Sequence, residues 1–427
     1  MVDVLERGKS SERLSSQRPF LVLAHGYQPH REPFLPNGQR LNVVPHINET
    51  IYGQVYKSVF LEGNAVLGGM VFSFFPGVRD WLKTDHPSEL EAIVAKINTI
   101  PNKEYHVLGD PYIHLILPLQ VKEDQAMLFQ IGKEAFRRDL GFDPKGVWLP
   151  ETAVSHDTLD AASDNGYEFV ALRDNQLLRS DLNPARVATK NGRGISVIHF
   201  NSGLSGSLSF DDGASLNADS FLEGLLRFDS ETVVVGSDLE LYGHHKKDRD
   251  KFLEYLVQPG TLGKHGFIPF DVKGVIEGET GEVTDIREGS SWSCEHSLGR
   301  WTGECSCDNA SELARNDKSR FYTTLGNYGR ELNSRLDKAD PNWRSNFVNF
   351  FLENRDVMFG KKSLSAIRKE DVLLWAKYCE LVGKTSCGWF FGSNDTPERE
   401  IPRVMMGAIE QLVPDINEHI IFQQQAA

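Results

Sequence analysis

The chain has 427 residues, of which 40% are hydrophobic and 25% charged, and its formal net charge is −14. This composition is typical of a globular protein, and the length allows one large domain with a smaller one, or two or three ordinary domains. An excess of negative charge repels phosphate groups, so nucleic acid and anionic membrane surfaces are disfavoured as partners, and a neutral substrate is favoured.

The first residues of the chain, MVDVLERGKSSERLSSQRPF, are polar and charged. They lack the apolar segment, about 7–15 residues long, of a secretory signal, and no apolar run of about 18 residues indicates a membrane span. The five cysteines are an odd number, which favours reduced thiols. We therefore expect a cytoplasmic protein with a disordered tail over residues 1–17.

Short apolar runs alternate with amphipathic segments through the first two-thirds of the chain. The predicted strands are Phe20–Ala24, Met70–Phe74, Val147–Leu149, Phe169–Leu172, Ile195–Phe200 and Thr232–Gly236. The helical segments between them include Glu123–Leu140 and Ser155–Asn165. Strands that alternate with helices predict an α/β fold with parallel strands and helical crossovers, either a barrel or an open sheet.

The pattern changes beyond about residue 310. Apolar residues there recur at helical spacing, as in Phe321, Leu325, Tyr328, Leu332 and Leu336, and strand-like runs become rare. We expect a C-terminal helical bundle of roughly 110 residues, which the Gly- and Ser-containing region 274–310 joins to the first part.

Ionisable residues follow three of the predicted strands. His25, Glu151 and Asp238 come after the first, third and last of them. In parallel α/β folds, residues at the carboxyl ends of strands face the binding crevice. Each residue alone is more often a polar loop residue, but the three together indicate an active site.

Two carboxylates at strand ends suit glycoside hydrolysis. One acts as nucleophile or base, and the other protonates the leaving oxygen. Trp148 and Tyr242 are close to the two carboxylates in sequence and offer flat surfaces for sugar rings, although each also suits the core.

Five segments resemble a known family of enzymes. They are HGYQP at residues 25–29, WLPE at 148–151, DLELYGHH at 238–245, SWSCEH at 291–296 and TSCGWFF at 385–391. The first three resemble, in order, the sugar-site motifs of glycoside hydrolase family 57, and the last two resemble segments of a poorly characterised branch of it. The resemblance spans about residues 20–410, and five ordered motifs are more specific than one.

This resemblance implies an incomplete (β/α)7 barrel over residues 18–285 and a C-terminal helical domain over residues 286–427 that completes the active site. It implies retaining hydrolysis of α-linked glucan or oligosaccharide without a cofactor or catalytic metal, with Glu151 as nucleophile and Asp238 as general acid/base. The residues implied to bind sugar hydroxyls are His25, Gln28, His114 and His245. Those implied to close the site from the C-terminal part are Trp292, His296 and Trp389.

Three alternatives remain open. A 4-α-glucanotransferase or branching enzyme would use the same catalytic pair, with a sugar hydroxyl intercepting the covalent intermediate. A metal-dependent sugar deacetylase would draw its ligands from Asp238, His25, His244 and His245, although Glu151 in its Trp-Leu-Pro-Glu setting favours the metal-free glycosidase. A non-catalytic glycan-binding protein would keep the aromatic residues without needing both carboxylates.

A Cys-x-His pair followed by a Cys-x-Cys pair forms a further motif. Its members are Cys294, His296, Cys305 and Cys307. Such residues suit a structural zinc or other metal site. The usual Cys-x2-Cys pair is missing and free cysteines are often simply buried, so the sequence leaves a metal at this motif undecided.

Overall fold

The computed structural model of the protein describes residues 17–63, 66–181, 183–278, 283–364, 366–392 and 396–418. The tail predicted over residues 1–17 lies outside these ranges except for its last residue. None of the helices formed by the described residues combines the length and the apolar composition that crossing a membrane requires.

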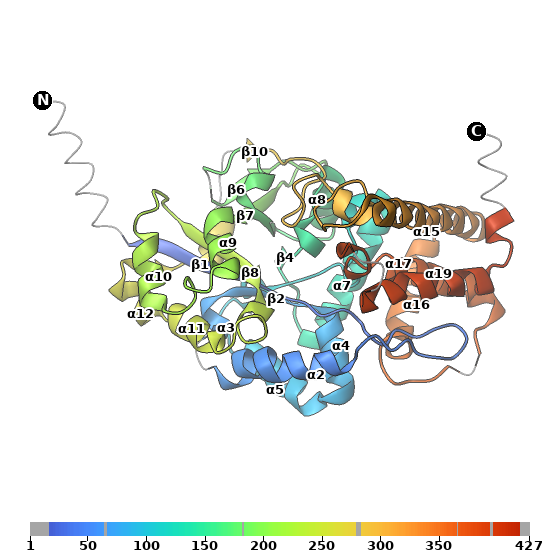
Figure 1. The fold of residues 1–427 in the computed structure, drawn as a ribbon, viewed down its shortest axis with the longest axis horizontal. Helices are drawn as coiled ribbons and strands as arrows, with labels where there is room; N and C mark the ends of the chain where they lie inside the picture. The colour runs from blue at the N-terminus through green and yellow to red at the C-terminus, as the bar shows by residue number, and fades with distance from the viewer. Residues whose placement is uncertain are drawn as a thin grey trace, which may run out of the picture.

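Seven parallel strands form the centre of the first region (Figure 1). They are β1 (Arg18–Gly26), β2 (Val71–Phe74), β3 (Val107–Leu108), β4 (Gly146–Val147), β5 (Phe169–Arg173), β7 (Ile195–Phe200) and β8 (Val233–Asp238). Hydrogen-bonded pairing gives the order β3-β2-β1-β8 in one sheet and β7-β5-β4 in the other.

Two further contacts join these sheets. A parallel bridge between Gly109 and Val147 connects the β3 end to β4. The Asn201 amide donates to the Val234 carbonyl at 2.9 Å, which connects the β7 end to β8. The seven strands therefore close into a barrel with one strand fewer than a complete (β/α)8 barrel.

Strand β1 shows why these residues form a barrel wall. Leu21 and Leu23 pack inside the barrel, whereas Phe20, Val22 and Ala24 pack outward among the covering helices. Alternate side chains of a strand point to opposite faces, so a strand buried on both faces is an unbroken apolar run. Three short strands extend the sheets: β6 (Ala185–Val187), β9 (Phe267–Pro269) and β10 (Val283–Thr284).

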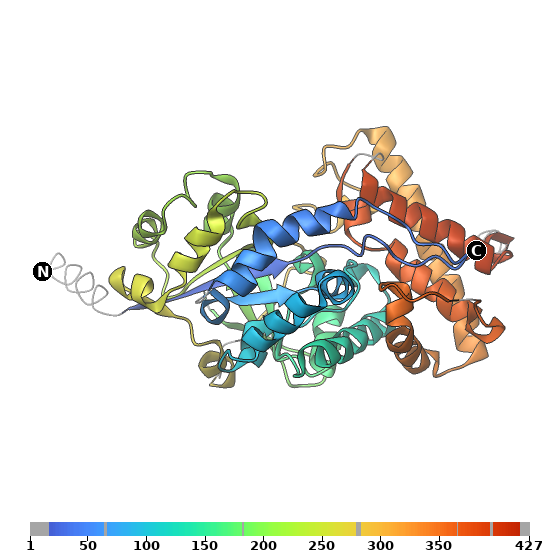
Figure 2. The same cartoon turned by 90° about the horizontal axis from the view of Figure 1, so that it is seen from below.

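Helices surround the barrel. The longest of them are α4 (Pro76–Asp85), α5 (Pro87–Ile97), α7 (Lys122–Leu140), α8 (His156–Asp164), α9 (Ser202–Phe210), α10 (Ala218–Leu225) and α11 (Arg249–Leu256). Shorter ones are α2 (His46–Ile51), α3 (Val66–Gly69), α6 (Lys103–His106), α12 (Pro259–Lys264) and α13 (Val272–Glu277). These helices lie around the strands and cover the outside of the barrel (Figure 2).

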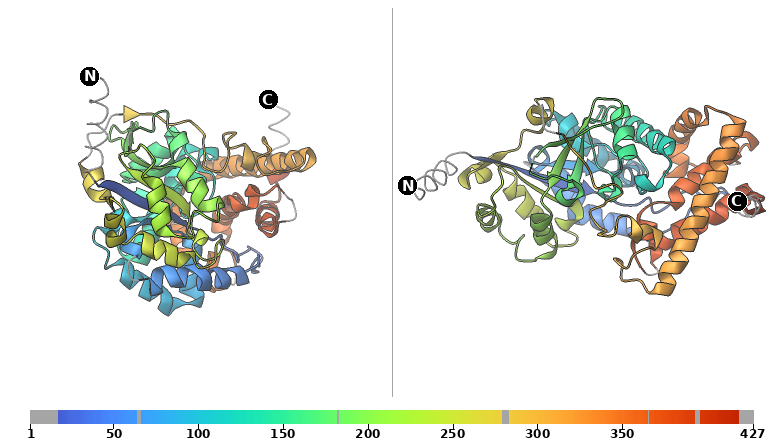
Figure 3. Two further views of the ribbon diagram at one scale, coloured as in Figure 1. Left: turned by 60° about the vertical axis from the view of Figure 1, so that its left-hand side comes forward. Right: turned by 90° about the horizontal axis from the view of Figure 1, so that it is seen from above.

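The C-terminal region is helical. Its helices are α14 (Gly299–Thr302), α15 (Glu312–Ala339), α16 (Trp343–Met358), α17 (Val372–Gly383), α18 (Cys387–Phe390) and α19 (Glu400–Leu412). Leu128 and Phe129 of α7 share one apolar cluster with Phe351 of α16, so these helices pack directly against the barrel (Figure 3).

The expected fold, an incomplete (β/α)7 barrel followed by a helical bundle, is confirmed. All six predicted strands overlap observed ones, and the two predicted helical segments correspond to α7 and α8. The boundary between residues 285 and 286 falls directly after β10 and remains a prediction.

Candidate active site

The carboxyl ends of the barrel strands gather the predicted catalytic residues. In the pairing of β1 with its neighbours, His25 lies opposite Ser73 of β2 and Asp238 of β8. The ring of Trp292 lies 6.2 Å from that of His25, and its indole N–H donates to Glu151 at 3.1 Å. His25, Asp238 and Glu151 therefore lie around one mouth of the barrel.

The backbone at Glu151 has an unusual conformation. Pro150 favours an extended residue before it, and Glu151 and Thr152 then have left-handed φ values of 57° and 48°. The Thr152 hydroxyl donates to Gln176 at 2.8 Å and accepts from the Trp292 amide at 3.0 Å. Residues in such conformations cost about 1–3 kcal/mol each and persist only where surrounding contacts hold them. The turn thus fixes the direction of the Glu151 side chain.

Two side chains of the segment after β10 hold the Glu151 carboxylate. Trp292 Nε1 donates at 3.1 Å and Ser293 Oγ at 2.8 Å, both to Oε2. No described residue donates a hydrogen bond to Oε1. Burial raises the pKa of Glu151, while the two hydrogen bonds and the charge of Arg300 oppose that rise. One carboxylate oxygen is anchored, and the other is available to a substrate.

Asp238 combines solvent exposure with strongly perturbed acidity. The residue is exposed, yet desolvation by the surrounding protein raises its pKa well above the ordinary value, and the charges of Glu240 and Glu151 raise it further. Water therefore reaches this carboxyl group, while the protein around it disfavours its charged form. A carboxyl group that keeps its proton near neutral pH suits general-acid catalysis.

Glu240 is a buried carboxylate of the site that the sequence did not single out. It accepts hydrogen bonds from the Tyr56 hydroxyl, from Gln28 Nε2 at 3.1 Å and from the Tyr27 amide at 3.2 Å. Burial raises the pKa of Glu240 to about 7, and these hydrogen bonds oppose the rise. The predicted residue Gln28 is thus connected to the site through Glu240.

Two buried histidines link the barrel to the C-terminal region. His25 Nδ1 lies 2.7 Å from Ser73 Oγ, and its Nε2 lies 3.2 Å from His114 Nε2. His114 Nδ1 lies 2.6 Å from Ser386 Oγ. Burial lowers the pKa of His25 to about 3 and that of His114 well below its usual value, so both rings are neutral. A neutral imidazole has one donor and one acceptor, and both nitrogens of His25 are engaged within the protein.

Aromatic rings line the same mouth. Trp148 stacks on His25 with ring centroids 4.8 Å apart, and Tyr27 stacks on His114 at 3.8 Å. Trp148 is fully buried, whereas Tyr27 and Trp292 are partly exposed. Trp148 therefore has no exposed ring surface for its predicted contact with sugar and packs inside the barrel, whereas Tyr27 and Trp292 offer ring surface to a sugar.

Two predicted aromatic residues lie in the core. Tyr242 is fully buried among the apolar side chains outside the barrel. Trp389 is fully buried in the C-terminal core, where its indole N–H donates to the Gly383 carbonyl at 2.9 Å. Neither residue has exposed ring surface, so the structure does not support their predicted contact with sugar.

Two predicted histidines make other contacts. His245 is exposed, and its ring lies beside that of His244, whose Nδ1 is 2.8 Å from Gln54 Oε1. His296 is exposed, and its Nδ1 lies 3.1 Å from Cys307 Sγ. Their predicted contacts with sugar hydroxyls remain predictions.

One group of side chains within the described ranges has metal-ligand atoms close enough together to hold an ion. It consists of Cys294, His296, Cys305 and Cys307, whose ligand atoms all lie within 4.8 Å of one another. The residues considered for a deacetylase, Asp238, His25, His244 and His245, form no such group in the part of the chain that the structure describes.

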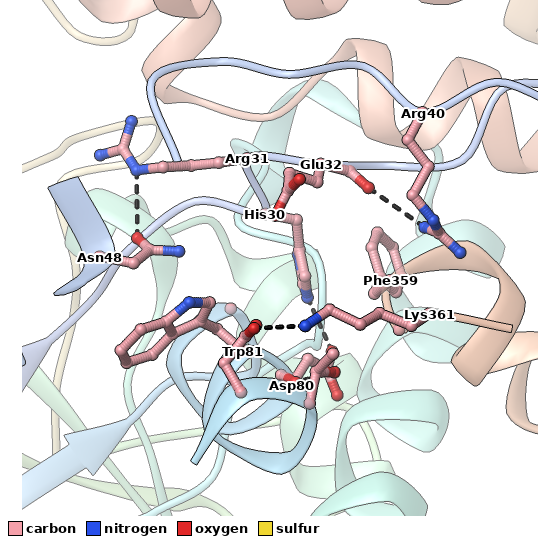
Figure 4. A pocket seen from close by; sticks show the side chains of 13 residues that line it. His30, Arg31, Glu32, Arg40, Asn48, Asp80, Trp81, Phe359 and Lys361 are labelled. Atoms are coloured by element: carbon pink, nitrogen blue, oxygen red, sulfur yellow. Dashed lines mark hydrogen bonds and ion pairs between the residues drawn. The ribbon is translucent and has the colours of Figure 1, made fainter. Parts of the chain in front are cut away.

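A pocket between the barrel and the C-terminal helices contains different chemistry (Figure 4). His30, Asp80 and Trp81 line it from the barrel, and Phe359 and Lys361 line it from the segment after α16. His30 Nε2 lies 2.8 Å from Asp80 Oδ2. None of the residues predicted for the active site lines this pocket.

The sequence matches one family of enzymes. The profile described as glycosyl hydrolase family 57 matches residues 28–277, which is more than half of the chain and includes both Glu151 and Asp238. No curated protein matches the chain.

Several solved structures share the fold. The exo-type maltose-forming amylase from Pyrococcus sp. ST04 has a TM-score of 0.70 at 17% identity, and the alignment covers 95% of this chain and 80% of that one. The GH57-type branching enzyme from Pyrococcus horikoshii has a TM-score of 0.64 at 12% identity, with 96% and 92% covered. The 4-α-glucanotransferase from Thermococcus litoralis has a TM-score of 0.59 at 16% identity, with 93% and 60% covered. At these identities the likeness shows a common fold.

Proposed function

The chain belongs to glycosyl hydrolase family 57, and we propose that it is a retaining enzyme that cleaves α-linked glucan or oligosaccharide by double displacement. One observation carries this proposal. Glu151 and Asp238 lie at the same barrel mouth in different environments, one anchored through Oε2 by two donors and the other with its pKa raised well above the ordinary value. Two carboxyl groups whose environments separate their acidities suit the roles of nucleophile and acid.

In the first step, Glu151 Oε1 attacks the anomeric carbon while the Asp238 carboxyl group gives its proton to the glycosidic oxygen. The carbon–oxygen bond breaks, the alcohol leaves, and a glycosyl ester forms on Glu151. Trp292 and Ser293 hold Oε2 during this step, so the carboxylate does not have to reorient.

In the second step, the Asp238 carboxylate accepts a proton from water, whose oxygen attacks the anomeric carbon. The ester bond breaks, Glu151 leaves as the carboxylate, and the sugar has its original anomeric configuration. If a sugar hydroxyl takes the place of water, the same step transfers the glycosyl group. The partly exposed rings of Tyr27 and Trp292 would bind the acceptor sugar in that case.

The substrate assignment rests on the family and on the site. The enzymes with a similar fold are described as a maltose-forming amylase, a GH57-type branching enzyme and a 4-α-glucanotransferase. The mouth of this barrel combines neutral histidines with aromatic rings, which suits an uncharged polyhydroxylated ligand.

The test is to incubate the purified full chain with a series of maltooligosaccharides and to separate the products by chromatography. Hydrolysis gives new reducing ends, whereas transfer gives longer and shorter chains without them. Glu151→Ala and Asp238→Asn should remove the activity, and Asp181→Asn, at an exposed carboxylate, should not. The proposal is wrong if no α-glucan is changed, or if Glu151→Ala acts at the wild-type rate.

A further inference from the structure

The segment between Ser293 and helix α15 folds back on itself. Ser297 has a left-handed φ of 56° and Gly303 a φ of 80°, so the chain turns sharply on either side of the short helix α14. A Cβ placed on Gly299 would lie 3.1 Å from Cys305 Cβ, which shows how closely the parts of the segment before and after the turn approach each other. This turn brings a Cys-x-Cys pair back beside a Cys-x-His pair.

Four potential metal ligands lie together where the two ends of this segment approach each other. Cys294 Sγ lies 3.7 Å from Cys305 Sγ and 3.8 Å from Cys307 Sγ, and His296 Nδ1 lies 3.1 Å from Cys307 Sγ. All four ligand atoms lie within 4.8 Å of one another. The cluster is therefore compact in every direction.

These distances agree with a tetrahedral zinc site. With zinc–sulfur bonds of about 2.3 Å, the sulfur–sulfur edges of the tetrahedron are about 3.8 Å. The corresponding nitrogen–sulfur edge is about 3.5 Å, and the exposed ring of His296 can move outward by this small difference. A disulfide requires sulfur atoms about 2.05 Å apart, and one disulfide would leave the other two ligands without a role.

We propose that Cys294, His296, Cys305 and Cys307 bind one Zn²⁺ through three thiolates and an imidazole nitrogen. Four protein ligands complete the coordination of the ion, so the site is closed and structural, and no position remains for a catalytic water. Because thiols must lose their protons to bind, zinc uptake releases protons and weakens as the pH falls.

The position of the cluster gives the zinc a second consequence. Trp292 and Ser293, which hold the Glu151 carboxylate, directly precede the ligand Cys294. At the other end, Asp308 follows the ligand Cys307 and forms an ion pair with Lys318 of α15. The zinc thus fixes the segment that positions Glu151, and Trp292 and Ser293 act as positioning residues.

The first test is the metal content of the full chain purified from zinc-supplemented cells. We expect one zinc per wild-type chain, and a loss of at least tenfold in bound zinc for Cys305→Ala. Cys379→Ala, at a buried cysteine outside the cluster, is the matched control and should keep one zinc per chain. A wild-type chain without zinc, or Cys305→Ala with full zinc, overturns the proposal.

Two further measurements use only the wild-type chain, so they test the proposal even if Cys305→Ala fails to fold. The wild-type chain unfolded in chelator should have five reactive thiols, whereas three would indicate a disulfide and overturn the proposal. Cobalt added to the apoprotein should give the visible absorption of a tetrahedral thiolate complex at one equivalent, and its absence would also overturn it.

A third measurement separates a structural from a catalytic ion. Replacement of zinc by cobalt or cadmium should restore the melting temperature that a chelator lowers and change turnover on α-glucan less than twofold. A turnover that changes more than tenfold with the identity of the metal contradicts the closed structural site. Metal content is independent of activity, so failure of the proposed function leaves this test intact.

Discussion

Two regions of the molecule surround carboxyl groups with protein and shift their pKa values in opposite directions. At the seam between the barrel and α16, Arg355 donates to Asp80 at 2.7 Å and to both oxygens of Asp139 at 2.7 Å. Burial alone would raise the pKa of Asp80, but the charge of Arg355 and hydrogen bonds from His30 and Tyr112 hold it well below the ordinary value.

At the barrel mouth the direction is reversed. Burial raises the pKa of Asp238, and the neighbouring Glu240 and Glu151 raise it further. Within the described residues, none of these three carboxylates has a Lys or Arg ion-pair partner, whereas Asp80 and Asp139 share one.

The contrast distinguishes carboxylates that stabilise the fold from carboxylates that take part in catalysis. A paired carboxylate stays ionised and ties two parts of the fold together, and it becomes costly when its partner is removed. A carboxylate that protein surrounds without a cation keeps its proton to higher pH and is available as an acid. Substitutions at the seam should therefore affect stability, and substitutions at the mouth should affect turnover.

The largest effect is expected at the mouth. Asp238→Asn should lower kcat on unactivated α-glucosides by about 10²–10⁴-fold, because it removes general-acid assistance. Substrates with good leaving groups should lose less, since they need less protonation. The melting temperature should stay close to that of the wild type. A near-normal rate on unactivated substrate would remove Asp238 from the mechanism.

Arg355→Met should give the opposite result. It removes the guanidinium partner of the buried Asp80 and leaves Asp139 paired with Arg79 alone, so we expect the free energy of unfolding to fall by about 3–5 kcal/mol in urea titrations at neutral pH. At temperatures where the variant is folded, kcat should remain within a few-fold of the wild-type value. A large loss of kcat in the folded variant would show that the seam and the mouth are not separate.

Ser293→Ala should move the acidic side of the pH profile. The Ser293 hydroxyl donates to the ionised form of Glu151, so its loss raises the Glu151 pKa, and activity should appear only at higher pH. A single hydrogen bond to a charged group contributes about 1.5–3 kcal/mol, so kcat/KM at the optimum should fall by no more than about 100-fold. An acidic side that does not move contradicts the assignment of Glu151 to it.

Glu240→Gln should move the alkaline side, with the smallest change in rate. Glu240, whose pKa is raised to about 7, is ionised above neutral pH and there helps to raise the pKa of Asp238. Its neutralisation lowers the Asp238 pKa, so activity should decline at lower pH than in the wild type. Glu277→Gln, at an exposed glutamate, should leave the profile unchanged. An alkaline side that moves upward would contradict the coupling.

The sequence predicted the barrel well where strands are long apolar runs. The predicted strand Ile195–Phe200 coincides with β7, because four of its six residues are apolar and all six are buried. Strand β3, only Val107–Leu108, was missed. Two residues carry no periodicity, and only the neighbouring strands make this segment part of the sheet.

The burial and contacts of some residues of the site could not be predicted from the sequence, because they depend on the tertiary structure. Tyr242 and Trp389 are aromatic residues in motif segments, and residue type alone does not distinguish a sugar platform from a core residue. Glu240 lies in the motif segment DLELYGHH, but its sequence neighbours do not show that its carboxylate is buried. His296 lies beside a cysteine because of the turn after it, which no local pattern in the sequence specifies.

The most direct test of the central claim is the anomeric configuration of the first-formed product, followed by NMR before mutarotation. We expect hydrolysis by the wild-type chain to release an α-configured sugar from an α-glucan, because Glu151 forms a covalent intermediate and two inversions retain the configuration. A β-configured first product would contradict it, since a single displacement by water would make Glu151 a base or a bystander.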